Sequence, residues 1–204
     1  MTLHKPKARF MFETLDQIEE DIRKSLAEAA SNRRSPMHTP VVGTPDADVR
    51  MMVLRGWDAR AGTLRLHTDA RSAKVAQIGD GARVGLLFHD PDARIQIRAK
   101  GQGRILTDGA QVEAAWAASS EYARRCYLAV AAPGSAVDAP TSGLPPQVEG
   151  IRPSEEQLLP ARENFALLMV EVDAFDWLLL AHDGHRRAQF VRDGAGWQGV
   201  WVVP

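Results

Sequence analysis

The feature that most constrains this chain is a succession of short apolar runs that contain β-branched residues and partly alternate with polar ones. Four runs follow one another in the first half of the chain: VRMMVLRG (49–56), GTLRLHT (62–68), ARVGLLFH (82–89) and RIQIRAKGQGRIL (94–106). The turn signals WDARAG, DG and DPD separate them. Runs of this length with such turns between them predict an antiparallel sheet or barrel.

The last part of the chain shows the same pattern of short apolar runs. Four further runs are predicted as strands joined by hairpins: FALLMVEVD (165–173), FDWLLLAH (175–182), RAQFVRD (187–193) and GWQGVWVV (196–203). The sequence therefore predicts a mainly β protein with flanking helices, a β-barrel-like core and a single domain over residues 1–204.

Helical spacing identifies the first flanking helix. Residues 13–30 carry an apolar stripe, and Thr14 with Gln17 forms a capping box at the start; the stripe consists of Leu15, Ile18, Ile22 and Leu26. Residues 31–48 contain prolines and a glycine, which predicts a connecting loop.

The other connections are predicted from composition. A short helix, SAKVAQIG, lies between the second and third runs, and the alanine-rich stretch from about 108 to 131 favours helix. Ser154 with Gln157 offers a second capping box. The Pro/Gly/Ser-rich loop at about 133–150 has a length typical of functional or mobile loops.

Composition narrows the class of protein. The 25 basic and 26 acidic residues nearly balance, and the basic residues form no stripe, so we expect neither nucleic acid nor a membrane as partner. The single cysteine, Cys126, allows no intrachain disulfide. The first residues, MTLHKPKARF, lack the apolar region of a signal peptide. We expect a soluble, cytoplasmic protein.

Two pairs of residues could hold an anion. Arg50 and Arg55 bracket an apolar run, where they either mark the solvated ends of a strand or face a ligand. Ser72 and Lys74 follow the LHT end of the second run. Ser72 is either an ordinary helix cap or, with the helix amides and the ammonium of Lys74, part of a phosphate site. Both interpretations remain open on the residues alone.

Two further elements could meet a flat ligand. Gln96 alternates with Ile95 and Ile97, so a buried amide there needs a partner in the backbone or in the heteroatoms of a ring. Trp177 with Arg187 could edge an aromatic cofactor, although Trp177 equally suits the core.

Taken together, residues 50–106 resemble the FMN-binding core of the pyridoxamine 5'-phosphate oxidase family. That family has an Arg-x-x-Val-Leu-(Lys/Arg) strand, an aromatic-Thr pair, a Ser-x-Lys turn, a Leu-Leu-Phe strand and a Gln in the next strand. This sequence presents them in order as RMMVLR, HT, SAK, LLF and RIQI. His67 stands in place of the family's aromatic residue, and Thr68 keeps the hydroxyl.

The resemblance implies a split β-barrel homodimer that binds FMN at the subunit interface. It implies that Arg50, Ser72 and Lys74 hold the phosphate and that Gln96 hydrogen-bonds the flavin ring. Arg55 stands where the family has a lysine near flavin and substrate. The other implied contacts are Met51, Val53 and Leu54 along the ring, His67 and Thr68 beside it, and Trp177 and Arg187 from the second subunit.

The substrate segment departs from the family. Its Tyr…Arg-Pro…Ser pattern is replaced by SSEYARRCYLAVAAPGSAV, which lacks the Arg-Pro pair. DGHRRAQF replaces the Arg-x-His motif near the end, so Arg186 and Arg187 compete for the cofactor contact. We predict an FMN-dependent oxidoreductase acting on a small organic substrate, of which pyridoxamine or pyridoxine phosphate oxidation is the narrowest version. A flavin-binding module without turnover, or one that binds haem or deazaflavin, is the alternative.

Overall fold

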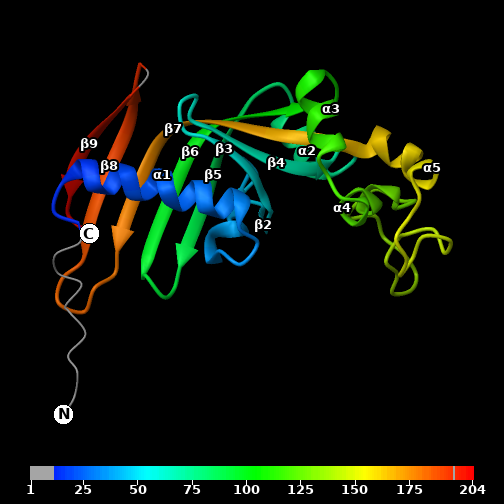
Figure 1. Cartoon of the computed structure of the whole chain (residues 1–204), viewed down its shortest axis with the longest axis horizontal. Coiled ribbons are helices and arrows are strands. Elements are labelled where there is room, and N and C mark those ends of the chain that lie inside the picture. The colour runs from blue at the N-terminus through cyan, green and yellow to red at the C-terminus, as the bar shows by residue number, and fades with distance from the viewer. Residues whose placement is uncertain (1–11, 195) are drawn as a thin grey trace, which may run out of the picture.

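A computed structural model describes residues 12–194 and 196–204 (Figure 1). Its strands form one antiparallel sheet in the order β2-β1-β5-β6-β7-β4-β3, with β8 added to β7 and β9 to β8. The strands are β1 (Val41–Gly43), β2 (Val49–Met51), β3 (Leu54–Asp58), β4 (Thr63–Asp69), β5 (Ala82–Asp90), β6 (Ile95–Leu106), β7 (Phe165–Leu179), β8 (Arg186–Asp193) and β9 (Gly196–Val202).

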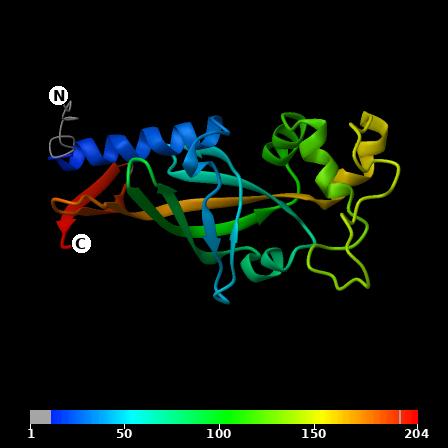
Figure 2. The ribbon, with the colours of Figure 1, turned by 90° about the horizontal axis from the view of Figure 1, so that it is seen from below.

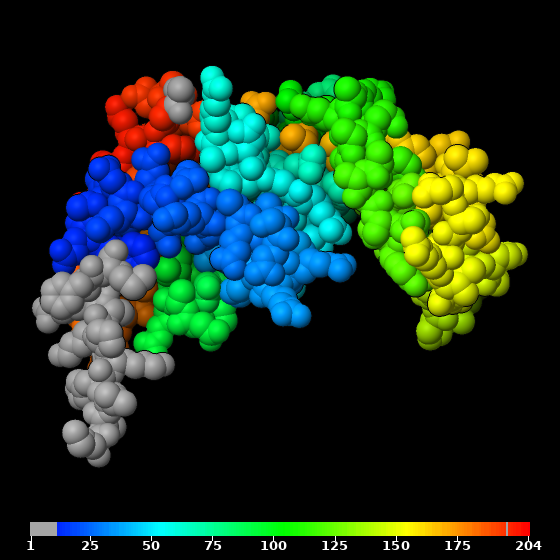
Figure 3. Space-filling model, viewed as in Figure 1, coloured from blue at the N-terminus to red at the C-terminus, as the bar shows by residue number. Residues whose placement is uncertain are grey.

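Helices and 3-10 turns flank the sheet at separate places. Two of them, α1 (Leu15–Ser31) and α2 (Ala73–Ile78), belong to the first half of the chain, as does the 3-10 turn η2 (Pro36–His38). The others form a region that projects from one end of the sheet (Figure 3): α3 (Ala110–Ala117), α4 (Glu121–Arg125), η3 (Cys126–Leu128), α5 (Glu155–Leu158) and η4 (Leu159–Asn164).

The two longest strands, β6 and β7, pair over almost their whole length (Figure 2). Their register shifts between Lys100 and Gly101, which makes a β-bulge in β7. A Cβ atom at Gly101 would lie 2.2 Å from the carbonyl oxygen of Glu171, so only glycine allows this close approach. The bulge increases the local twist and lets the sheet curl into a half-barrel.

The main core lies between the curled sheet and α1. Odd-numbered residues of β6, such as Ile95 and Ile97, point into it and meet the stripe of α1 formed by Ile18, Ile22 and Leu26. A smaller apolar cluster lies on the opposite face of the sheet under α3; it consists of Val112, Ala115, Phe165, Leu167 and Met169. The far end of that opposite face carries no helix, and even-numbered residues of β6 point to it.

The predicted fold class is confirmed, since the chain forms a curled antiparallel sheet with flanking helices. Both predicted capping boxes are present, at Thr14–Gln17 and Ser154–Gln157. The helix predicted from about 108 to 131 is instead divided into α3, α4 and η3, because Ser120 caps a new helix after Ala117.

Three strand predictions were wrong. Residues 49–56 form two strands, because the amide of Met52 donates to Pro40 O at 3.0 Å and diverts the chain from β1 to β4. Residues 165–179 form one strand, because β6 pairs with most of it on one edge and β4 and then β8 pair with it on the other. The loop predicted at 31–48 contains β1, which has β2 and β5 on either side.

Trp177 occupies the core and not a ligand-facing surface. Its side chain is fully buried, it packs edge-on against Phe12 with ring centroids 4.9 Å apart, and its Nε1 donates to Asp21 of α1 at 2.8 Å. Burial raises the pKa of Asp21, and the hydrogen bond from Trp177 opposes this effect. The indole therefore anchors α1 to the sheet and has no surface to offer a cofactor.

We expect Trp177→Phe to destabilise the protein by about 1–3 kcal/mol more than Trp57→Phe at neutral pH, because it leaves the Asp21 carboxylate without its donor. Trp57 is a matched control, since its Nε1 is buried and donates to no acceptor in the described residues. Urea unfolding of both variants measures the difference. The difference in unfolding free energy between the two variants should become smaller in acid. The raised pKa of Asp21 means that its carboxyl in the folded protein is protonated at a higher pH than usual, and the neutral carboxyl needs the donor less. Equal losses of stability in the two variants would contradict the role of Trp177 as an anchor of α1.

Candidate functional site

The turn after β4 gathers one ammonium and two hydroxyls. Nζ of Lys74 donates to Oγ of Ser72 at 2.9 Å and to Oγ1 of Thr68 at 3.3 Å. Thr68 and Ser72 are buried, and their hydroxyl oxygens lie 3.2 Å apart. Ser72 Oγ donates to Asp69 O at 2.7 Å and makes no hydrogen bond to the backbone of α2. Ser72 therefore holds the lysine and does not act as an ordinary helix cap.

Arg50 approaches this turn from β2. Its Nη1 donates to Oγ1 of Thr44 at 3.0 Å, and Thr44 in turn donates to Oε1 of Gln77 in α2 at 2.9 Å. Its Nη2 pairs with the exposed carboxylate of Asp48. Arg50 and Arg55 do not share a strand, so only Arg50 belongs to this group. We call Arg50, Thr68, Ser72 and Lys74 the cation cluster.

The cation cluster has more positive charge than its own contacts neutralise. Within residues 12–194 and 196–204, no carboxylate lies within ion-pair distance of Lys74. Burial lowers the pKa of Lys74, and the nearby Arg50 guanidinium lowers it further. Two cations and two hydroxyls around one turn fit a phosphate dianion, because an anion there would relieve both effects.

Arg55 and His67 lie at the β-bulge where β3 meets β4. Nε of Arg55 and Nε2 of His67 are buried and have no hydrogen-bond partner among the described residues. His67 packs edge-on against Phe165 with ring centroids 4.9 Å apart. Burial, followed by the charges of Arg55 and Arg65, lowers the pKa of His67 to about 3. The imidazole is therefore neutral at physiological pH.

The apolar residues between the two arginines lie in different surroundings. Met51 is 67% exposed on β2, Val53 is half-buried between the strands, and Leu54 is fully buried in the main core. Leu54 can therefore meet a ligand only through its backbone. Met51 and Val53 have side-chain surface to offer.

A second polar group lies on the helix-free face of the sheet. Arg187 on β8 holds Asp176 of β7 through Nη2 at 2.7 Å, and the same carboxylate accepts from Arg98 at 2.7 Å and Gln189 at 2.8 Å. Gln96 lies next to Leu178, which pairs with Arg187, so it faces the same side. We call Gln96, Arg98, Asp176, Arg187 and Gln189 the polar-face group.

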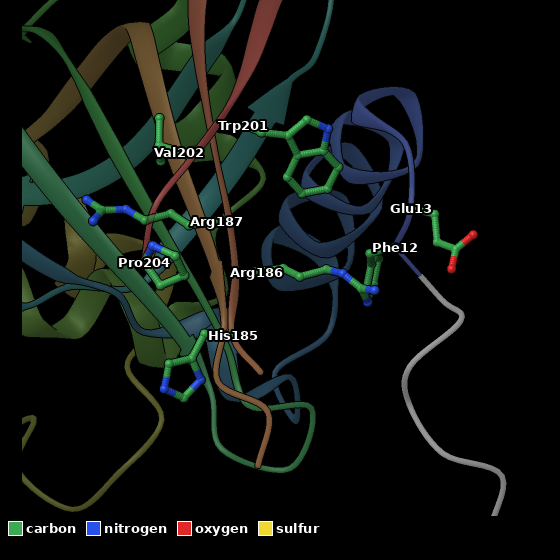
Figure 4. A pocket seen from close by; sticks show the side chains of 8 residues that line it. All are labelled: Phe12, Glu13, His185, Arg186, Arg187, Trp201, Val202 and Pro204. Atoms are coloured by element: carbon green, nitrogen blue, oxygen red, sulfur yellow. The ribbon is translucent and has the colours of Figure 1, made fainter. Parts of the chain in front are cut away.

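The two neighbouring arginines of β8 point in different directions (Figure 4). Arg186 extends toward Phe12 at the start of α1, whereas Arg187 extends to the other side of the strand. Both border a hollow of about 460 Å³ that His185 and Trp201 also line. Of the two, Arg187 is the one that shares the face with Gln96.

Thr68 of the cation cluster and Arg187 of the polar-face group lie far apart within one chain. Thr68 pairs with Ala166 near the start of β7, and Arg187 pairs with Leu178 near its end. The twelve residue steps from Ala166 to Leu178 correspond to roughly 40 Å of strand at about 3.3 Å per step. β7 runs the length of the sheet in Figure 2 without folding back. A single ligand of flavin size therefore cannot reach from Thr68 to Arg187 of the same chain.

Some of these residues were missed from the sequence. Thr44 lies in a segment predicted as loop, and no local pattern distinguishes it. Arg98 alternates with Gln96, so the period of the strand could have placed it on the same face. Asp176 could not have been found, because the wrong break at residue 174 hid its place opposite Arg98.

Part of the chain is similar in sequence to known proteins. Residues 15–107 match the family described as pyridoxamine 5'-phosphate oxidase, FMN-binding domain. A pyridoxine/pyridoxamine 5'-phosphate oxidase of Nitrobacter winogradskyi is 32% identical over 87 residues. That match covers 41% of this chain and 40% of the relative's length.

Solved structures extend the likeness in fold to most of the chain. A pyridoxamine 5'-phosphate oxidase-related, FMN binding protein of Nostoc punctiforme has a TM-score of 0.68 and 23% identity, over 91% of this chain and 96% of its own. PhzG of Burkholderia lata, solved with tetrahydrophenazine-1-carboxylic acid, has a TM-score of 0.64 and 18% identity, over 91% of each chain. At these identities the likeness concerns the fold.

No helix among the described residues is long and apolar enough to cross a membrane. The sequence match over residues 15–107 includes the cation cluster, Arg55 and Gln96, and the fold match covers both ends of the sheet. The resemblance predicted from the sequence is therefore confirmed for residues 15–107, which are similar to the FMN-binding domain of the pyridoxamine 5'-phosphate oxidase family, and the chain as a whole has the split-barrel fold of the solved FMN-binding proteins.

Proposed function

We propose that the protein is an FMN-dependent oxidoreductase acting on a small organic substrate. The observation that carries the proposal is the cation cluster, where the ammonium of Lys74 has hydroxyl partners and no carboxylate partner among the described residues. An oxygen-rich dianion would supply the missing negative charge. The family match over the same residues supports the phosphate of FMN as that anion.

Each part of the site has a distinct role in this proposal. Arg50 and Lys74 bind the phosphate, while Thr68 and Ser72 hold the ammonium in place. Met51 and Val53, with the backbone of Leu54, line the ring. Arg55, whose Nε is buried without a partner, holds an acidic group of the substrate beside the ring.

Bound FMN supplies hydride chemistry between the substrate and either molecular oxygen or a nicotinamide cofactor. The protein's own task is to hold the cofactor, to orient the substrate and to limit water at the ring. The neutral imidazole of His67 contributes a polar edge without adding a third charge beside Arg55. We assign no general acid or base.

We further propose a homodimer in which one protomer's cation cluster and its partner's polar-face group hold the same flavin. Two observations support it. Thr68 of the cation cluster and Arg187 of the polar-face group lie roughly 40 Å apart along β7, so that one chain cannot bring these two residues to one ligand. The helix-free face also exposes apolar side chains at its two edges: Val49, Met51, Val191 and Val200 are 54–67% exposed. A second copy would cover this face and bring in Gln96 and Arg187.

A second candidate function is a flavin-binding module without turnover. The observation that favours it is the state of Arg124, the one buried arginine in the segment that replaces the family's substrate motif. Its guanidinium makes two hydrogen bonds to Glu155, at 2.8 and 2.9 Å, and so is already neutralised.

Replacing either cation should weaken FMN binding. We expect Arg50→Ala and Lys74→Ala each to cost about 1.5–3 kcal/mol of binding free energy, the range for a hydrogen bond to a charged group. Fluorescence titration of the apoprotein with FMN measures the change. Lys24→Ala, an exposed lysine of α1 paired only with Glu20, is the matched control and should bind like the parent. Parental affinity in both cluster variants would refute the phosphate site.

Mixing two defective variants tests the shared site. Lys74→Ala removes one half, and a Gln96→Leu, Arg187→Gln double variant removes the other. If the two halves come from different protomers, refolding the variants together at equal amounts should restore about a quarter of the parental flavin content, because half of the dimers then carry one intact site. The flavin retained after gel filtration is the readout. No recovery in mixed dimers would place both halves in one chain.

Reduction of the bound flavin separates the two candidate functions. We expect anaerobic addition of pyridoxamine 5'-phosphate or NADPH to bleach the flavin band and air to restore it. Arg55→Met should slow bleaching by the effective donor while retaining FMN, because it removes the charge beside the ring and leaves the cation cluster intact. A protein that retains FMN and resists both donors would fit the module without turnover.

A further inference from the structure

A groove on the α3 side of the sheet belongs to neither group described above. It has a volume of about 640 Å³ and lies between the β3–β4 hairpin, the end of β6 and α3. This volume is within the range of small-molecule sites. None of its lining residues belongs to the cation cluster or the polar-face group; those used below are Arg65, Arg104, Gln111, Ala114, Met169 and Glu171.

Two arginines flank an apolar floor in this groove. Arg65 on β4 and Arg104 on β6 both pair with Met169 on β7, so the three side chains form one row across the sheet. With strands about 4.8 Å apart, the two arginine Cα atoms are roughly 10 Å apart. Met169 forms the floor between them, and α3 borders it with Ala114 and Gln111.

Arg65 has hydrogen-bonding capacity that the chain does not use. Its Nη2 donates to Arg55 O at 3.0 Å, but its Nε is buried without a partner and no carboxylate of the described residues pairs with it. A Cβ at residue 56 would lie 3.3 Å from this Nε, so Gly56 lets the guanidinium lie against β3. A fixed and partly buried cation without a counter-charge is costly unless an anion joins it.

The acidic residues of the groove already have partners. Glu171 lies 3.4 Å from Arg104, and both of these side chains are about half exposed. Asp58 accepts from the backbone amides of Arg60 and Ala61 in the hairpin turn. Their presence disfavours a dianion such as phosphate and favours a single negative charge. A planar guanidinium pairs with a carboxylate through two parallel hydrogen bonds.

We propose that the groove binds a small organic carboxylate, with its carboxylate between Arg65 and Arg104 and its apolar body on Met169 and Ala114. Gln111 adds an amide at the rim. The site is separate from the FMN phosphate site and does not depend on the proposed redox activity. Arg65 also donates to Arg55 O, so an anion bound to Arg65 is connected by one hydrogen bond to the backbone of the hairpin that carries Arg55 and His67.

The probe for this site is 2-naphthoate, titrated calorimetrically into the full chain with and without saturating FMN. We expect saturable binding, one molecule per chain, in both conditions. Arg65→Gln and Arg104→Gln should each weaken it at least about 10-fold, the effect of losing a charge-assisted hydrogen bond. Arg60→Gln is the matched control, because Arg60 is exposed in the same hairpin outside the groove. It should bind like the parent.

One further variant and two further ligands complete the binding test. Ala114→Trp fills the groove from an exposed position of α3 without altering charge, and should abolish binding even if Arg65→Gln fails to fold. Uncharged methyl 2-naphthoate and inorganic phosphate should bind at least about 10-fold more weakly than the carboxylate. Parental binding in Ala114→Trp, equal binding of the ester or phosphate, or displacement by FMN would each overturn the proposal.

Discussion

The close pairing of β6 with β7 is the constraint on which the rest of the molecule depends. At Gly101 the strands approach so closely that a Cβ atom would lie 2.2 Å from the Glu171 carbonyl oxygen. The bulge at this point keeps the core residues of both strands on one face while the sheet turns. Larger residues at position 101 would force the strands apart. The curvature of the sheet at this point would then be lost.

The length of β7 divides the functional residues between its two ends. β4 joins β7 near its start and delivers Thr68, Ser72 and Lys74, while β8 joins near its end and delivers Arg187. The main core lies on one face under α1, where Trp177 and Asp21 fix the helix. The opposite face is thereby left without a helix except at one end, where α3 packs on it. The proposed two-chain site uses this open face.

The sequence reveals the elements whose signals are local. The alternation in 82–89 and 94–106 predicts β5 and β6 closely, and the Thr14–Gln17 box predicts the start of α1. The break at Met52 and the continuity of β7 depend on partners distant in sequence, namely Pro40 for the first and β6 for the second. Neither leaves a mark in the composition of its own segment, which is why both predictions were wrong.

The same distinction applies to the candidate site. SAK after a strand predicts a basic turn, and the structure gives Ser72 the role of holding Lys74 and not of capping α2. Trp177 illustrates the opposite case: an indole before a basic strand fits a cofactor edge as well as a core. Only the half-buried Asp21, 156 residues away in sequence, identifies its place. That partner could not be inferred from the run FDWLLLAH.

The β3–β4 hairpin concentrates positive charge that its own residues cannot remove. Arg55 and Arg65 are joined through one carbonyl oxygen, and arginine does not lose its proton in proteins. His67 is neutral beside them, because burial and then the charges of Arg55 and Arg65 lower its pKa to about 3. Since neither arginine loses its proton, only an external anion can reduce the repulsion between the charges of Arg55 and Arg65. The hairpin therefore favours anionic ligands on both of its sides, at the bulge beside Arg55 and in the groove beside Arg65.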